Sequence, residues 1–542
     1  MRNTLRDAAI VELKSRVLEA CIMQSRLPDG MPLDVLVNDT LHHEKKRLET
    51  DRKNPRWAED VAFWDGIKNK LGKGGDDDVR ALLASVIGRF ADEIRGNFSP
   101  PLYQVATRVL PKALPMLLNA MSPRRLFQRG IPDISDTIAI QGNVDGLKKV
   151  AERGTIILTP THVSNLDSPV VGWAIYAMGL PAFTYGAGLN LFSNPVMALF
   201  MRNLGAYRVD RNKTAPLYKD VLKEYATVSM ELGNHNLFFP AGTRVRSGKI
   251  EQHLKLGLMS SGIKAYINNL QRKRDKPNLY IVPCTLNYYL VLEAETLIEE
   301  HLKREGKSRY IIAQDESYLV RKYLQFTQNL INLEARITLH VGDPIDPFGN
   351  RVDPDTGDSL DRHGRNIDIT RYVTDRGGNP VHLPQRDRVY TSEAGVSVAR
   401  QFLRHNVVVA TQLVAFTLWE MLTRRHPDMD LYRLVRTGDE GLGVSLQVLT
   451  EKVMKVWQVV HERATRGELH LESGVVASGD AAAIVRAALR HFGTYHARPV
   501  ITRRGDRAFC EDMKLLLYYS NRLRGYGLER EIAPIVGTEA AA

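Results

Sequence analysis

His162 and Asp167 are the residues whose types and spacing best fit proton-transfer chemistry. They follow the run Thr155–Thr159, which we interpret as a buried strand, and α/β sheets place their reactive groups at strand ends. Histidine takes a proton from a hydroxyl near neutral pH, and a carboxylate on its other ring nitrogen fixes the tautomer. A capping aspartate beside a hydrogen-bonded surface histidine is the structural alternative, because such a pair often arises by chance. The pair predicts general-base activation of a hydroxyl, if other motifs support it.

Two later segments place arginines at turns. GAYRVDR (205–211) has Arg208 and Arg211 on a predicted strand and at its exit. PAGTRVRSGK (240–249) follows an apolar run and contains Gly242, Thr243, Arg244, Arg246 and Lys249. Guanidinium groups and the free N–H groups of a Gly-Thr turn match phosphate oxygens, so these segments predict a phosphate site. Salt bridges or contacts with a lipid surface are the alternative for the arginines.

In this order the motifs resemble the glycerolipid acyltransferase superfamily, and more narrowly its glycerol-3-phosphate and dihydroxyacetone phosphate acyltransferase branch. Each block alone is weakly specific, whereas the ordered set is a strong signal. The blocks are HxxxxD at His162–Asp167, G-x-x-x-x-x-R at Gly205–Arg211, F-P-x-G-T-R at Phe239–Arg244 with Arg246, and V-P at Val282-Pro283.

The resemblance implies transfer of a fatty acyl group from acyl-CoA or acyl carrier protein to a hydroxyl of glycerol 3-phosphate. In the implied reaction Asp167 orients His162, and His162 deprotonates the hydroxyl, which attacks the thioester directly. The arginines at 208, 211, 244 and 246 would hold the acceptor phosphate. Backbone N–H groups between His162 and Asn165 would stabilise the oxyanion. No metal and no cofactor is expected beyond the thioester co-substrate.

Ala241 departs from the family pattern, which usually has glutamate at this position, associated with binding the glycerol backbone. The substitution leaves open a lysophosphatidate acyltransferase or another lipid-acceptor O-acyltransferase. A catalytically silent lipid-binding scaffold is the alternative from another class of protein.

The composition favours anionic partners. The chain has 542 residues, a formal net charge of +12 and a pI near 9.4. CoA, glycerol phosphate, acyl carrier protein and an anionic membrane surface all carry the matching charge. Nucleic acid is not expected, because the arginines are not interleaved with aromatic residues that could stack on bases. The three cysteines are scattered and suggest neither disulfides nor a zinc site, which fits a reducing cytoplasm.

Two uncharged stretches bear on membranes. Residues 168–201 are interrupted by glycines and prolines, and residues 406–419 are shorter than a span, so neither predicts a transmembrane helix. We interpret the first as a partly exposed apolar surface or acyl groove, with buried core as the alternative. The second fits a core helix, although Val398–Leu422 with its flanking arginines is also a candidate membrane contact. We therefore expect a peripheral or monotopic protein on the cytoplasmic face of the membrane.

The patterning predicts an α/β protein with a mixed, mostly parallel sheet flanked by helices, and helical N-terminal and C-terminal regions. We place a helical region at 1–130, the acyltransferase domain at 131–345, a linker or surface arm at 346–390, and a helical module at 391–542. Pro283 predicts an edge strand or a strand's start. The charged stretch 42–53 is interpreted as a solvated helix face or loop. Candidate strands are 137–142, 155–159, 206–209, 236–239, 279–285 and 336–341.

Overall fold

A computed structural model describes residues 3–52, 56–96, 99, 138–188, 205–305, 337–436, 443–493 and 496–536. The N-terminal helices are α1 (Asn3–Ser25), α2 (Leu33–Thr50), α3 (Trp57–Lys70) and α4 (Asp76–Ile94). The central region contains β1 (Ile138–Gly142), α8 (Val144–Arg153), β2 (Thr155–Pro160), α9 (Asp167–Ala177), β3 (Thr184–Gly188), β4 (Ala206–Val209), α11 (Pro216–Glu231), β5 (Asn236–Leu237), α12 (Ser260–Gln271), β6 (Leu279–Tyr288), α13 (Ala294–Arg304) and β7 (Ile337–Val341).

The remaining elements follow β7. They are β8 (Arg351–Val352), β9 (Ser359–Leu360), β10 (Asn366–Ile367), η2 (Ile369–Tyr372), α15 (Pro384–Arg404), β11 (Val407–Val408), α16 (Ala410–Arg425), α17 (Leu431–Arg436), β12 (Gly443–Ser445), α18 (Leu446–Thr465), β13 (His470–Leu471), α19 (Ala481–Phe492), β14 (Ile501–Arg504), β15 (Arg507–Cys510), α20 (Met513–Ser520), η3 (Asn521–Leu523), α21 (Leu528–Glu531) and α22 (Ala533–Val536).

The central sheet confirms the predicted fold class. Within the described residues it has seven strands in the order β1-β7-β6-β2-β5-β3-β4, and all neighbours pair in parallel except β6 and β7. The predicted unit of strand, helix and strand is present as β1, α8 and β2, with Gly154 just past the helix. β2 is buried along its whole length, as its apolar run predicted.

The prediction that Pro283 marks an edge strand or a strand's start is wrong, because β6 lies inside the sheet between β2 and β7 and Pro283 is in the middle of it. The Pro283 carbonyl accepts a hydrogen bond from the Gly342 N–H at 2.8 Å, and Ile281 exchanges two backbone hydrogen bonds with Ile345. Odd-numbered positions of β6 therefore direct their backbone polar groups toward the segment that follows β7. The N–H that proline lacks would face this irregular segment, so no bond to β2 is lost.

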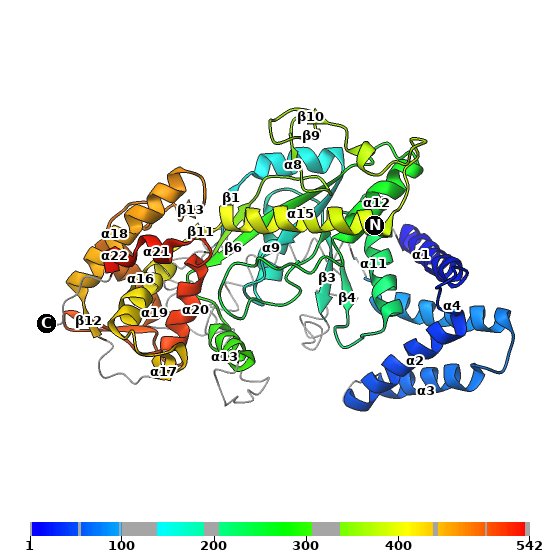
Figure 1. Ribbon diagram of the computed structural model, residues 1–542, viewed down its shortest axis with the longest axis horizontal. Coiled ribbons are helices and arrows are strands. Elements are labelled where there is room, and N and C mark those ends of the chain that lie inside the picture. The colour runs from blue at the N-terminus through cyan, green and yellow to red at the C-terminus, as the bar shows by residue number, and fades with distance from the viewer. Residues whose placement is uncertain are drawn as a thin grey trace, which may run out of the picture.

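Helices α1 to α4 pack against α11 and β4 around a core that is separate from the main one (Figure 1). The prediction that the charged stretch 42–53 is solvated is wrong in part, because some of its charged side chains are buried. The Glu44 side chain is 1% exposed and pairs with Lys213 at 2.9 Å, and Arg47 pairs with Asp60 at 2.9 Å. Partner charges from other elements allow these groups to be buried, and the pattern of one helix cannot reveal such partners.

The C-terminal helices lie at the opposite end of the sheet (Figure 1) and share its largest hydrophobic core. The predicted continuous helix Val398–Leu422 is instead two helices, α15 and α16, separated by the short strand β11. Residues 410–422 of α16 are buried throughout, against α18, α19 and α20. The alternative role of this segment as a membrane contact is therefore wrong, and its lack of charge reflects a core position.

Residues 346–390, predicted as a linker or surface arm, contain the strands β8 to β10, η2 and the start of α15. Phe348 is buried, and its ring packs edge-on against the rings of Tyr372 and Tyr390. The ring centroids are 5.2 Å apart in both pairs. These contacts fold the segment back onto α15.

None of the helices in the described ranges combines the length and the apolar character that crossing a bilayer requires. The uncharged stretch 168–201 contains most of α9 and all of β3, and its residues 189–201 lie outside the described part of the chain.

Candidate functional site

The carboxyl ends of parallel strands bring the candidate residues to one edge of the sheet. His162 follows β2, and Arg211 follows β4. Residues 240–249, the arginine-containing loop, follow β5, and Tyr288 ends β6. These four strands run in the same direction, so the segments that leave them emerge on the same side. Residues far apart in the sequence therefore meet in one place.

The structure brings His162 and Asp167 into direct contact. Nδ1 of His162 lies 2.8 Å from Oδ2 of Asp167, and the Asp167 side chain is completely buried at the start of α9. The Tyr288 hydroxyl donates to Oδ1 of Asp167 at 2.6 Å. With Nδ1 facing a carboxylate, Nε2 is the ring atom that can receive a proton. The histidine side chain is 12% exposed, and its ring stacks on the Phe239 ring at 4.3 Å between centroids.

Carboxylates hold the backbone of the loop between β2 and α9. Glu251 accepts from the His162 N–H at 2.7 Å, and Glu293 accepts from the Asn165 N–H at 3.2 Å. Oδ2 of Asp167 accepts from the two N–H groups in between, at 2.6 and 2.9 Å. The expectation that these N–H groups serve as oxyanion donors is therefore not met, because all four point at protein carboxylates. These four hydrogen bonds fix the position of the loop that carries His162 instead.

Arg211, Arg244 and Arg246 form a cluster of positive charge beside the dyad. Arg244 lies 3.5 Å from Glu293, and Arg246 donates to Glu300 of α13 at 2.6 Å, so both are partly neutralised. Arg211 reaches solvent, and the described residues offer it no carboxylate. Local burial, together with the charges of Arg244 and Arg246, lowers the pKa of Arg211. The cluster has an excess of positive charge and one guanidinium available for an anion.

The turn after β5 presents this cluster. Gly242 has a φ of +70°, which favours glycine, and its N–H donates to the Phe239 carbonyl at 2.9 Å. Thr243 accepts a hydrogen bond from Arg246 at 3.4 Å. Arg208 lies half-buried on the edge strand β4, in register with Ala187, and its role in binding substrate stays a prediction.

Sequence reasoning missed four residues that build this site. Tyr288 and Glu293 orient the loop through Asp167, Ser164 and Asn165, as the hydrogen bonds show. Burial raises the pKa of Glu251, and Arg522, from the C-terminal region, offsets this. Tyr288 was predictable in part, since it ends the parallel neighbour of β2. No local pattern marks the two glutamates or the arginine.

The C-terminal region also contacts the arginine-containing loop directly. The Asn521 side chain donates to the Ser247 carbonyl at 2.7 Å. A side chain at Gly248 would lie 2.1 Å from the Tyr518 carbonyl, so the backbones of the loop and of α20 are in close contact. This loop is thus held from two sides, by the sheet and by α20 with η3.

Comparison with known proteins agrees with this geometry. An acyltransferase family model matches residues 141–287, which include both the dyad and the arginine-containing loop. The chain is 29% identical over 47% of its length to a Mycobacterium tuberculosis protein with the provisional name acyltransferase plsB1, of which the match covers 40%. It is 30% identical over 36% of its length to the glycerol-3-phosphate acyltransferase of Aeromonas hydrophila, covering 24% of that protein. The corresponding enzyme of Histophilus somni is 29% identical over 36% of this chain and 23% of its own length.

The chain thus spans less than half the length of these curated relatives. The family model nevertheless matches the segment that contains His162, Asp167 and the arginines. Residues 141–287 are therefore an acyltransferase domain of the glycerolipid acyltransferase superfamily, from its glycerol-3-phosphate acyltransferase-like branch.

Proposed function

We propose that this protein is an O-acyltransferase that moves a fatty acyl group from acyl-CoA or acyl carrier protein to a hydroxyl of glycerol 3-phosphate. The observation that carries the proposal is the His162–Asp167 pair beside three arginines, at the carboxyl edge of one sheet. The names of the relatives support the same acceptor.

His162 acts as the general base in the proposed reaction. Its Nε2 takes the proton of the acceptor hydroxyl while the hydroxyl oxygen attacks the thioester carbonyl carbon. The carbon–sulfur bond then breaks, and the leaving thiolate takes the proton back from the imidazolium. Asp167 stabilises the imidazolium through Nδ1, and the three hydrogen bonds that Asp167 accepts from Val163, Ser164 and Tyr288 hold it in place. No covalent acyl-enzyme is required.

The arginine cluster holds the acceptor phosphate in this proposal. No carboxylate among the described residues pairs with Arg211, and its guanidinium fork matches the oxygens of a phosphate. Arg244 and Arg246 add charge, although Glu293 and Glu300 partly neutralise them. A phosphate dianion would complete the cluster and relieve the repulsion among the arginines.

Acyl transfer from a labelled long-chain acyl-CoA, and from acyl carrier protein, to three acceptors tests the proposal. The acceptors are glycerol 3-phosphate, dihydroxyacetone phosphate and lysophosphatidate. We expect glycerol 3-phosphate to be labelled with the highest kcat/KM. A preference for lysophosphatidate would instead indicate that the small side chain of Ala241 enlarges the acceptor site for a bulkier substrate. Absence of transfer to every acceptor with both carriers would favour a silent lipid-binding scaffold.

Replacing Arg211 with alanine should lower kcat/KM for glycerol 3-phosphate by about 10- to 100-fold, mainly through KM. Hydrogen bonds to charged groups contribute about 1.5–3 kcal/mol, and each 1.4 kcal/mol corresponds to about tenfold. Steady-state kinetics with varied acceptor measures this. Arg211→Lys should retain part of the affinity because it keeps the charge without the fork. Arg362→Ala, on an exposed turn, is the control, and an equal loss there would argue against a phosphate site at Arg211.

We also propose that the protein works at an anionic membrane surface, since its acylated product partitions into lipid. The net charge of +12 supports such an attraction. In the described part of stretch 168–201, Tyr176 is 40% exposed. Running the same assay with and without anionic vesicles, and sedimenting the vesicles, would test this. Full recovery of the protein in the supernatant at low salt would count against it.

A further inference from the structure

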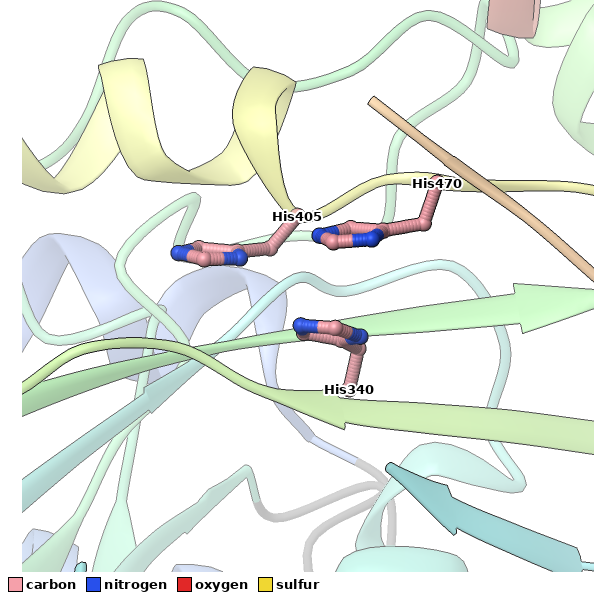
Figure 2. A group of neighbouring side chains, drawn as sticks. All are labelled: His340, His405 and His470. Carbon is pink, nitrogen blue, oxygen red and sulfur yellow. The ribbon is translucent and has the colours of Figure 1, made fainter. Parts of the chain in front are cut away.

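Three histidines far apart in the sequence converge at strand β7 of the central sheet. His340 lies on β7, His405 directly follows α15, and His470 begins β13. Figure 2 shows the rings of His405 and His470 next to one another above the ring of His340. His340 lies 4.3 Å from His470 and 4.9 Å from His405 between ring centroids, and each residue offers a ring nitrogen within 4.8 Å of the other two.

Three ring nitrogens of this cluster lack a hydrogen-bond partner within the described structure. Nδ1 of His340 and both ring nitrogens of His405 are buried with no hydrogen bond. Buried polar groups are nearly always satisfied, so three orphaned nitrogens in one place require an explanation. Glycines leave room for two of the rings. A Cβ atom at Gly142 would lie 2.8 Å from the His340 ring, and one at Gly342 would lie 3.1 Å from the His405 ring.

We propose that His340, His405 and His470 bind one Zn²⁺ ion at the junction between the acyltransferase sheet and the C-terminal helices. Neutral imidazole is a preferred ligand of zinc and of its neighbours in the transition series, whereas Mg²⁺ and Ca²⁺ prefer oxygen. Burial lowers the pKa of His340 to about 3 and that of His405 to about 4, so both are neutral near pH 7. This is the protonation state that ligates metal.

Closing around an ion requires the three rings to turn, because they now lie nearly parallel, with interplanar angles of 7–26°. Zinc–nitrogen bonds of about 2.0–2.1 Å place tetrahedral ligand atoms roughly 3.4 Å apart, which is closer than the present 4.8 Å limit. Rotation of the stacked rings would turn their lone pairs toward a common centre. Asp343 is the natural fourth ligand or outer partner, since its Oδ2 lies 3.8 Å from Nε2 of His405. The negative charge of Asp343 offsets the positive charge of Arg404, and both charges act on His405 and His470.

The site is separate from the proposed catalytic site and does not depend on the proposed function. β11 pairs with β13, with Val407 opposite His470, and the Thr285 hydroxyl of β6 donates to the His405 carbonyl. A bound ion would therefore join β7 of the sheet to the α15–β11 connection and to β13. The expected role is structural, with little effect on the acyl-transfer step itself.

Metal analysis of the full chain tests the inference. The chain should be produced without a polyhistidine tag, stripped with a chelator and incubated with Zn²⁺ alone. We expect about one tightly bound zinc per chain by elemental analysis, and a Tm raised by roughly 5 °C or more. Co²⁺ substitution should give the visible spectrum of a tetrahedral nitrogen-ligated ion. Failure of the stripped wild-type chain to bind Zn²⁺, or binding of Zn²⁺ no tighter than that of Mg²⁺ or Ca²⁺, would overturn the assignment.

Substitution identifies the ligands. His470→Ala should weaken Zn²⁺ binding at least about 100-fold while circular dichroism shows that the fold is kept, because His470 is the least buried of the three. His491→Gln is the matched control, since this buried histidine lies on α19 outside the cluster. Unchanged Zn²⁺ affinity in His470→Ala, or an equal loss in His491→Gln, would show that zinc binds elsewhere.

Discussion

Replacing His162 with alanine should lower kcat for acyl transfer by about 10²–10⁴-fold, the range typical for loss of a general base. The substitution removes the group that takes the hydroxyl proton and leaves the carboxylate contacts of the loop backbone in place. Initial rates at saturating donor and acceptor measure the effect, and circular dichroism checks the fold. His253→Ala, an exposed histidine after the arginine-containing loop, should retain wild-type kcat.

Asp167→Asn separates the charge of the dyad from its geometry. The asparagine oxygen can still accept the hydrogen bonds that Oδ2 receives, and the amide nitrogen can donate to the Tyr288 oxygen. The imidazolium loses its counter-charge, so we expect kcat to fall at least about 100-fold. Tyr288→Phe keeps the carboxylate and should cost much less. If His162→Ala or Asp167→Asn retained near-wild-type kcat, the proposed mechanism would be wrong.

Arg522→Leu should destabilise the protein by about 3–5 kcal/mol, because it leaves a buried carboxylate without its compensating charge. Arg522 is 5% exposed and donates to Asn406, to Asn287 and to the Leu286 carbonyl at 2.9–3.0 Å. It also interacts electrostatically with the buried Glu251, which holds the His162 N–H. We therefore expect Tm to fall by roughly 3–4 °C in a thermal melt, with activity reduced as well.

A second substitution identifies the cause of this loss. Glu251→Gln preserves an oxygen that can accept from the His162 N–H and removes the unpaired charge. The double variant Arg522→Leu, Glu251→Gln should consequently melt above Arg522→Leu alone. Arg530→Leu, an exposed arginine near the same end of the chain, is the control and should leave Tm nearly unchanged. Strictly additive losses in the double variant would refute the charge-compensation account.

The motifs predictable from the sequence are those whose chemistry lies within one loop. HxxxxD identified the dyad, because a loop of five residues after a buried strand can bring its own two ends together. The strands β1, β2, β4 and β7 were also predicted within one residue at each end, since their apolar runs have clear borders. Strand β6 was predicted three residues too short, and β5 two residues too long.

Composition did not distinguish between the two environments in which an uncharged run can lie. Residues 406–419 lack charge because three helices surround α16, and a membrane-facing helix would have had the same composition. The buried charges Glu44 and Arg47 show the converse, because charged residues signal solvent only where no partner meets them. In both cases the neighbours, and not the segment, decided burial.

The sequence alone determined the His162–Asp167 pair, the arginine-containing blocks and the α/β class, because each depends on residue types at short separations. Only the tertiary structure decided which carboxylates hold the dyad loop, how Arg522 reaches Glu251, and that His340, His405 and His470 meet. These contacts join residues separated by tens to hundreds of positions. Strand register and the packing of the C-terminal helices against the sheet bring them together, and no periodicity along the chain encodes that packing.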